Sequence, residues 1–324
     1  MMTLHLNATD LSRTVLRSAP SVLLELVAAG QRLFEATVPE HLTGWRARTR
    51  AALRPQMRPY LDLCRLSWWL PDFLTPPSFG TDPATALDEV CATPAARLDA
   101  ELRPRIEAGD LPARVAPLAD GNPAARQRLR AAMVAFHDVA VAPYWATITA
   151  AVRVDRAVRG STMVDAGIDR VLRNLSPYLY WKPSGERYEL SYECGFATEI
   201  GLAPTGRGVT LVPSYLLARP CVLDDPTGPM ALAYPIRPGQ PELTSRRPLA
   251  DLLGRTRAAV LGAIVDRPST SQVARTLGIS VASASQHAAT LRQAGLITTH
   301  RTGPAVLHTL TPLGEDLLRG GRAS

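Results

Sequence analysis

The feature that most constrains the fold of this chain is a glycine-centred turn near its C-terminus, at Gly278. Before the turn, apolar side chains at helical spacing predict a short helix, which Ser269 or Thr270 can cap. Gly278 can adopt the left-handed conformation that often ends a helix, and Ser280 can cap the next helix, predicted over 281–294. The chain is therefore expected to turn sharply between two short amphipathic helices.

The second of these helices is predicted to bury one stripe and to expose the opposite face. Ala284, Ala288 and Leu291 are spaced to lie along the buried stripe. The opposite face carries small or hydrogen-bonding side chains and no acid: Ala282, Gln286, Ala289, Thr290 and Gln293, flanked by Ser283 and Ser285. Such a helix can approach a DNA major groove closely, where Gln286 could pair bidentately with an adenine.

Further elements are predicted on both sides of this helix pair. Upstream, apolar residues within 249–264 form one face of a helix that must end before Pro268. Downstream, the segment 296–310 predicts a β-hairpin, with its turn at Arg301-Thr302-Gly303-Pro304. Thr311 can cap a last helix that begins with a proline, which is favoured at that position.

The order helix, helix, turn, helix, hairpin, helix resembles the ArsR-type, and more loosely the MarR-type, bacterial winged helix-turn-helix regulators. The segments that carry the resemblance are 255–261, 273–280, 285–287, 291–297 and 311–314, within about a quarter of the chain. Upstream, 71–77, 212–214 and 233–235 are similar to a long actinobacterial form of this family with an extra N-terminal region. The resemblance implies a homodimer, paired through the first and last helices of the domain, on a double-stranded DNA operator of roughly two-fold symmetry. Our hypothesis is that this dimer is a repressor, although the sequence does not give the sign of regulation.

The candidate DNA-contacting residues lie on the third helix and on the hairpin, which is the wing in this comparison. They are Ser280, Ser283, Ser285, Gln286, His287, Thr290, Arg292, His300, Arg301 and Thr302. We expect Gln286 to read a base edge, Arg292 to meet a phosphate, and the wing tip to touch backbone or minor groove. Two alternatives stay open: the two serines inside the helix can merely stabilise its end, and His287 can pack instead of touching DNA.

The positive charge of the chain is concentrated in this C-terminal part. The formal net charge is +7, from 36 basic and 29 acidic residues. From Arg246 onward there are ten arginines against four acids, a net charge of +6, which leaves +1 for the first 245 residues. Because phosphate neutralisation supplies most non-specific DNA affinity, the distribution favours a nucleic-acid-binding module at the C-terminus.

The rest of the chain is predicted to have α+β character. Residues 1–175 show mainly helical spacing, cut into short pieces by prolines. Residues 176–240 switch to short alternating and β-branched runs, which predict a small antiparallel β-rich segment. A proline- and glycine-containing linker at 237–241 would then lead into the winged helix-turn-helix domain, predicted over 246–324.

The sequence gives no indication of a metal or cofactor site. The four cysteines are scattered without a CxxC pair, and the histidines show no HxxxH or HxxE spacing. Members of the resembling family often bind metal on the helix before the turn or on the last helix, but here 271–275 and 315–318 contain neither Cys nor His. We therefore expect no metal, no cofactor, and any signal to be sensed in the N-terminal region.

The familiar catalytic signatures are also missing, since there is no GxSxG, no GxxxxGK[ST] and no HExxH. We expect a cytoplasmic, nucleoid-associated DNA-binding protein that is not an enzyme, does not bind membranes, and responds to an unknown small-molecule effector if it responds to one at all. Trp68 and Trp69 could line an effector pocket, although packing in the core or at a dimer contact is the simpler interpretation. The alternative is an enzyme or small-molecule-binding protein in the first 245 residues, with the winged helix as a protein interaction module.

Overall fold

The computed structural model describes residues 1–66, 68–76, 79–185, 187–194, 199–223, 229–236, 252–264, 268–302 and 305–322. The chain is mixed, 57% helical and 16% strand, which confirms the expected combination of helices and strands. It divides into two compact units, Met1–Leu243 and Thr244–Ser324. The division falls close to the domain start predicted at 246, whereas the predicted linker at 237–241 lies outside the described residues.

The N-terminal unit contains most of the secondary structure. Its helices are α1 (Ala8–Ser12), α2 (Val22–Phe34), α3 (Glu40–Ala51), α4 (Arg58–Leu61), α5 (Pro83–Cys91), α6 (Ala95–Glu107), α7 (Ala116–Ala119), α8 (Pro123–Ala140) and α9 (Trp145–Arg173). Short 3₁₀ turns are η1 (Pro55–Met57), η2 (Asp62–Cys64), η3 (Asp72–Leu74), η4 (Ala113–Val115) and η5 (Ala142–Tyr144). Its strands are β1 (Met2–Leu6), β2 (Val15–Leu16), β3 (Tyr180–Ser184), β4 (Arg187–Tyr192), β5 (Ile200–Leu202), β6 (Val209–Ser214), β7 (Cys221–Leu223) and β8 (Met230–Pro235).

These strands form two sheets, in the orders β3-β4-β1-β5 and β2-β6-β8-β7. In the first sheet β1 lies between β4, to which it is antiparallel with Met2 opposite Tyr192, and β5, to which it is parallel. In the second sheet β2, β6 and β8 run parallel, and only β7 is antiparallel. The prediction of a small antiparallel segment confined to 176–240 was therefore wrong. Strands from the first 16 residues enter both sheets, and pairing between segments so far apart leaves no local sequence pattern.

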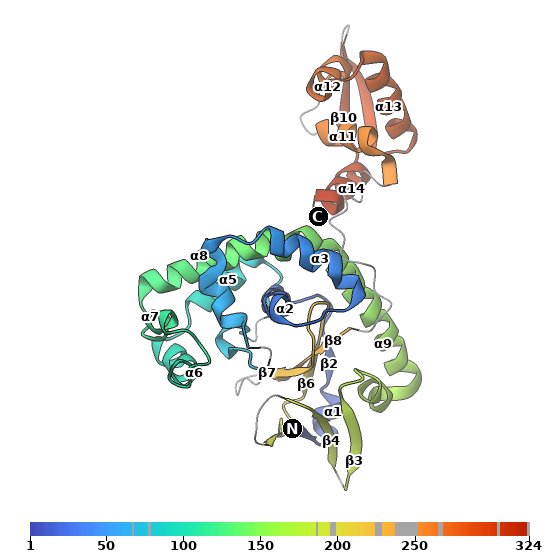
Figure 1. Ribbon diagram of the computed structural model, residues 1–324. Coiled ribbons are helices and arrows are strands. Elements are labelled where there is room, and N and C mark those ends of the chain that lie inside the picture. The colour runs from blue at the N-terminus through green and yellow to red at the C-terminus, as the bar shows by residue number, and fades with distance from the viewer. Residues whose placement is uncertain are drawn as a thin grey trace. The chain divides into compact units, whose positions relative to one another are not determined.

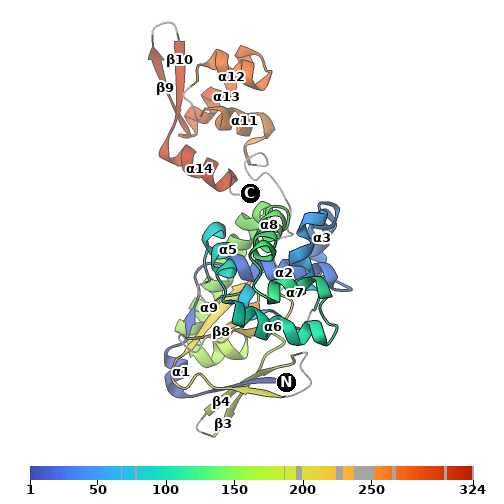
Figure 2. The same cartoon turned by 90° about the vertical axis from the view of Figure 1, so that its left-hand side faces the viewer.

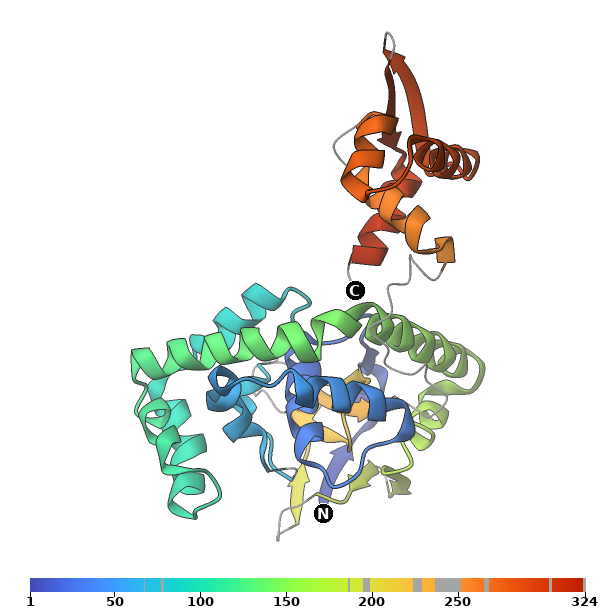
Figure 3. The same ribbon diagram turned by 45° about the horizontal axis from the view of Figure 1, so that its top comes forward.

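Helices cover both faces of the second sheet. Figures 1 and 3 show α2 on one side of β6 and β8 and α9 on the other. The burial of both strands agrees, since every residue of β8 except its last is buried, as expected for parallel strands covered twice. The apolar side chains of the sheets and of α2, α8 and α9 belong to one continuous core. The predicted helical region 1–175 and β-rich segment 176–240 thus belong to one unit.

Buried carboxylates tie the first helices to loops that follow much later in the sequence. Asp10 is fully buried, and one of its oxygens accepts hydrogen bonds from the amides of Gly206 and Gly208, at 2.7 and 3.2 Å. Its other oxygen accepts from the amide of Asn7, at 3.0 Å, completing a capping box at the start of α1. The N-terminal segment is held in place by these three bonds.

Glu25 on α2 makes a similar connection to the loop after β6. Its carboxyl oxygens accept hydrogen bonds from the amides of Tyr215, at 2.7 Å, and Leu216, at 2.9 Å. Arg32 lies about two turns further along α2. It donates to the carbonyls of Leu216 and Leu217 at 2.7 and 2.9 Å. Complete burial raises the pKa of Glu25 to about 7, against the opposing effect of the two amide donors.

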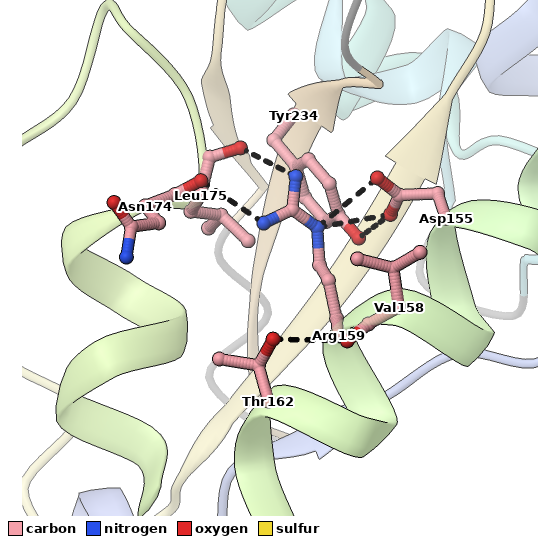
Figure 4. Close-up of polar contacts among 7 residues, drawn as sticks. All are labelled: Asp155, Val158, Arg159, Thr162, Asn174, Leu175 and Tyr234. Atoms are coloured by element: carbon pink, nitrogen blue, oxygen red, sulfur yellow. Dashed lines mark hydrogen bonds and ion pairs between the residues drawn. The ribbon is translucent and has the colours of Figure 1, made fainter. Parts of the chain in front are cut away.

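A third polar cluster joins α9 to the second sheet (Figure 4). The buried Arg159 donates to Asp155 at 3.0 Å and to the carbonyls of Asn174 and Leu175 at 3.1 and 2.9 Å. The Tyr234 hydroxyl on β8 donates to Asp155 at 2.7 Å, and its ring lies 4.9 Å from the guanidinium carbon. The charges of Arg159 and Asp155 neutralise each other, so we interpret this cluster as a structural connection between α9 and β8.

The C-terminal unit follows the order predicted from the sequence. Its elements are α11 (Arg255–Ala263), α12 (Thr270–Leu277), α13 (Val281–Gln293), β9 (Ile297–Thr302), β10 (Ala305–Leu310) and α14 (Pro312–Arg322). Figure 2 shows the β9–β10 hairpin extending past the helices of this unit. Its core is separate from that of the N-terminal unit and includes Val260, Ala284 and Leu291.

Candidate nucleic-acid interface

The turn between α12 and α13 has the geometry expected from its sequence. Ser269 is the residue that caps α12, and it forms a capping box with Gln272. Gly278 ends the helix with φ 64° and ψ 32°, a left-handed conformation that strongly favours glycine. The Ser280 hydroxyl then accepts a hydrogen bond from the amide of Ser283 at 3.1 Å, which caps α13. Three residues therefore suffice to redirect the chain from one helix to the next.

Helix α13 buries the stripe that was predicted and exposes the face opposite to it. Ala284, Ala288 and Leu291 are 0%, 4% and 1% exposed, respectively. The small size of the two alanines lets α13 pack closely on α11 and α12, with which it makes its main contacts. Gln286 lies on the exposed face, where its amide is free to meet an external hydrogen-bonding partner.

The candidate site residues whose side chains are described separate into two groups by burial. Ser280, Ser285, Gln286, Arg292 and His300 are exposed, whereas Ser283, His287 and Thr290 are half-buried. The Thr290 hydroxyl donates to the Gln286 carbonyl at 3.1 Å, and the Ser280 hydroxyl is used in the cap. These two hydroxyls therefore stabilise α13 and are less available to a ligand than the amide of Gln286.

The hairpin differs from the prediction at its tip. Strand β9 continues through Arg301 and Thr302, which pair with Val306 and Ala305, although both were expected in the turn. Cross-strand pairing continues because β-branched residues on both strands favour the ladder up to that point. The side chains of Arg301 and Thr302 and the predicted turn residues 303–304 lie outside the described residues.

The sequence analysis missed His308, which anchors the hairpin to the helices. Its imidazole is 3% exposed and lies between two hydroxyls, Thr270 at 2.9 Å from Nε2 and Thr299 at 3.3 Å from Nδ1. Its amide donates to the Pro268 carbonyl at 3.1 Å. Burial, together with the nearby charge of Arg292, lowers the pKa of His308 and favours the neutral ring. A histidine within a half-buried strand is the only local signal for this role.

The described arginines of the C-terminal unit carry uncompensated charge. Arg255, Arg257, Arg275 and Arg292 are exposed, and none of them makes an ion pair or a side-chain hydrogen bond with a described residue. In the N-terminal unit, by contrast, arginines on several helices are paired with carboxylates, as in Arg32–Glu35 and Arg173–Asp169. The guanidinium groups of these four residues are thus exposed to an anionic partner.

Other kinds of site find little support. Among the described residues, no group of three or more His, Cys, Asp and Glu side chains is placed to hold a metal ion. The four cysteines are free thiols. Trp68 and Trp69 lie under the Arg105 guanidinium, at 4.7 and 5.6 Å from its carbon, so these two rings are engaged in packing. None of the described helices combines the length and apolar character needed to cross a bilayer.

Comparisons of this chain with models of protein families, with curated proteins and with solved structures found no match. The function is therefore argued from the residues and geometry of the site alone.

Proposed function

We propose that the C-terminal unit is a winged helix-turn-helix domain and that the protein is a sequence-specific DNA-binding regulator of transcription. In this proposal α13 enters the major groove and the β9–β10 hairpin is the wing, which touches backbone or minor groove. The observation that carries it is the exposed face of α13. That face offers Gln286 and small side chains, the helix contains no carboxylate, and the exposed Arg292 pairs with no residue that the structure describes.

Each part of this arrangement corresponds to a requirement of groove binding. A recognition helix needs a face without bulky or acidic side chains so that it can approach base edges and phosphates. Gln286 supplies a donor and an acceptor for a base edge, and Arg292, one residue beyond the buried Leu291, supplies a cation for a phosphate. His308 fastens the wing to the start of α12, which fixes the hairpin relative to the helices.

We further propose that the active form is a homodimer that acts as a repressor. Two leucines at the beginning and end of this unit support a dimer contact there: Leu252, before α11, is 71% exposed and Leu313, on α14, is 58% exposed. Exposed leucines on the outer helices are suited to an isologous contact between two copies. Two recognition helices would then meet half-sites about one helical turn apart. The proposal assigns no catalysis to the protein, and places it in the cytoplasm at the nucleoid.

A gel-shift series with the full-length protein and duplex DNA from its own promoter tests this function. We expect retention of that DNA at about 150 mM salt with an affinity at least about 10³-fold above that for unrelated duplex of equal length. Equal affinity for both duplexes would contradict sequence-specific binding.

A single substitution tests the role of α13. Gln286→Ala should cost roughly 1–3 kcal/mol of binding and relax the preference at one base position. Gln127→Ala on α8, an exposed glutamine of the N-terminal unit, is the matched control and should bind as the unsubstituted protein does. Unchanged affinity and base preference for Gln286→Ala would contradict the proposal that Gln286 on α13 contacts a base.

A further inference from the structure

A cavity of about 330 Å³ opens on the N-terminal unit, far in sequence from the proposed DNA-binding residues. It lies between the η1–α4 segment and α8, with η4 and α7 completing its wall. Its size falls within the range of about 300–1,000 Å³ that small-molecule sites usually have. The cavity belongs to the N-terminal unit alone, so its properties do not depend on how the two units are arranged.

The charges around the cavity leave an excess of two cations. Asp62 is the acid among the lining residues, and its side chain is only 6% exposed. Arg114 binds it in a bidentate pair, with both N–O distances at 2.6 Å, so these two charges compensate each other. Arg58 and Arg128 also line the cavity, and neither guanidinium bonds to a residue that the structure describes. Their unpaired charges favour an anionic occupant.

The other residues that line the cavity are apolar. Val115, Leu118 and Leu129 line it and are 5%, 6% and 2% exposed, and Pro55 and Pro59 also line it. A hydrated inorganic ion would leave these surfaces without a partner, whereas a ligand with an apolar body would cover them. Two guanidinium groups beside apolar side chains suit a carboxylate attached to an apolar body, because guanidinium and carboxylate groups match in shape and charge and the body would cover the apolar side chains.

We propose that this cavity binds a small organic anion, namely a carboxylate carried on a compact apolar body. Arg58 and Arg128 bind the carboxylate, the Arg114–Asp62 pair holds the lining in place, and Leu118 and Leu129 contact the apolar body. The inference stands apart from the proposed DNA binding, since it uses no residue of the C-terminal unit.

Isothermal titration calorimetry of the full-length protein with benzoate and naphthoate tests the site, and benzyl alcohol and naphthalenemethanol serve as neutral probes of the same shape. We expect at least one carboxylate to bind at one site per chain, and its alcohol to bind at least about tenfold more weakly. Arg58→Ala with Arg128→Ala should weaken carboxylate binding by about tenfold or more. Arg153→Ala with Arg156→Ala removes from α9 two exposed arginines that pair with no described residue, and it should leave carboxylate binding unchanged.

Three results would overturn the proposal: absence of binding by both carboxylates, equal binding of the acids and the alcohols, or equal binding by the two double variants. Tryptophan fluorescence during urea unfolding checks that both double variants keep the stability of the N-terminal unit. The gel-shift assay tests a separate claim. If the protein did not bind DNA, the calorimetric result would still decide whether this cavity binds a carboxylate.

Discussion

The two units of this protein differ in the kind of contact that stabilises each of them internally. The N-terminal unit joins residues that are distant in sequence, such as β1 and β4, where Met2 lies opposite Tyr192. In the C-terminal unit the contacting elements are much closer in sequence, and Ile297 pairs with Leu310 across the hairpin. All 18 Phe, Trp and Tyr residues belong to the first 243 residues, so the C-terminal core is entirely aliphatic.

This difference affects both stability and the means of measuring it. A small unit with an aliphatic core and local contacts buries less apolar surface than a large one, so it should unfold more readily. Because every tryptophan lies in the N-terminal unit, tryptophan fluorescence reports on that unit alone. Far-UV circular dichroism reports on both units, and a transition seen only by that method belongs to the C-terminal unit.

The largest effect is expected from Gly314→Ala in α14. A β-carbon at this position would lie 2.0 Å from the Leu296 carbonyl oxygen, a backbone atom that cannot move aside cheaply. We expect the C-terminal unit to lose about 3 kcal/mol or more, while the fluorescence transition of the N-terminal unit stays in place. Gly262→Ala on α11 is the control, since its new methyl group meets no atom within 4 Å and should stabilise the helix slightly. A fluorescence transition that shifts with Gly314→Ala would show that the units do not unfold independently.

A somewhat smaller effect, confined to the other unit, is expected from Asp10→Ala. The substitution leaves the amides of Asn7, Gly206 and Gly208 without their acceptor inside the core. A loss of about 2–3 kcal/mol should appear in the fluorescence-detected urea transition. Asp82→Ala removes an exposed helix cap and should cost only about 1 kcal/mol. Equal losses for the two variants would mean that Asp10 does not tie the N-terminal segment to the 206–208 loop.

The two units should also respond to pH in opposite directions. Burial raises the pKa of Glu25 from its ordinary value of 4.5 to about 7, so the folded N-terminal unit holds this proton more tightly than the unfolded chain. The stability that protonated Glu25 contributes to the folded unit is fully present below pH 4.5 and is lost as the pH rises through 7. We expect the free energy of unfolding of this unit to fall between pH 5 and 8 relative to Glu25→Gln. Parallel pH curves for the two proteins would count against a raised pKa of Glu25.

A smaller pH effect of opposite sign is expected in the C-terminal unit. Burial and the charge of Arg292 lower the pKa of His308 from its ordinary value of 6.5, so folding favours the neutral ring. The stability of this unit should therefore be complete above pH 6.5 and decrease as the pH falls below it. His308→Gln should flatten the decrease seen by circular dichroism, whereas His300→Gln, an exposed residue of the same hairpin, should not. A decrease of equal steepness in all three proteins would rule out His308 as its cause.

The contrast between the units also explains which features could be predicted from the sequence. The caps of α12 and α13, the left-handed Gly278 and the buried stripe of α13 were predicted because each depends on residues within a few positions. The position of Leu252 was not. It was expected on the apolar face of the first helix but is 71% exposed. Gly254, with φ 82°, interrupts the predicted helix, so that α11 begins only at Arg255.

The N-terminal sheets show the opposite case. Met2–Leu6 alternates between buried and half-buried side chains, a strand pattern visible in the sequence, yet its partners lie about 190 residues further along. The parallel pairing of β6 with β8 likewise depends on the helices that cover both faces. In the candidate interface, the role of His308 was missed because its partner Thr270 belongs to another element. Contacts between elements that are distant in the sequence could therefore not be predicted from the sequence alone.

The salt dependence of DNA binding tests the central claim most directly. The association constant of the full-length protein for its own promoter should be measured between about 50 and 200 mM salt by fluorescence anisotropy. Each lost phosphate contact reduces the slope of log K against log salt by about 0.9, so Arg292→Ala with Arg301→Ala should make it shallower by about 1.8. The Arg153→Ala, Arg156→Ala protein, with the same change in net charge, should keep the original slope. Equal slopes for the two double variants would contradict DNA binding through the C-terminal unit.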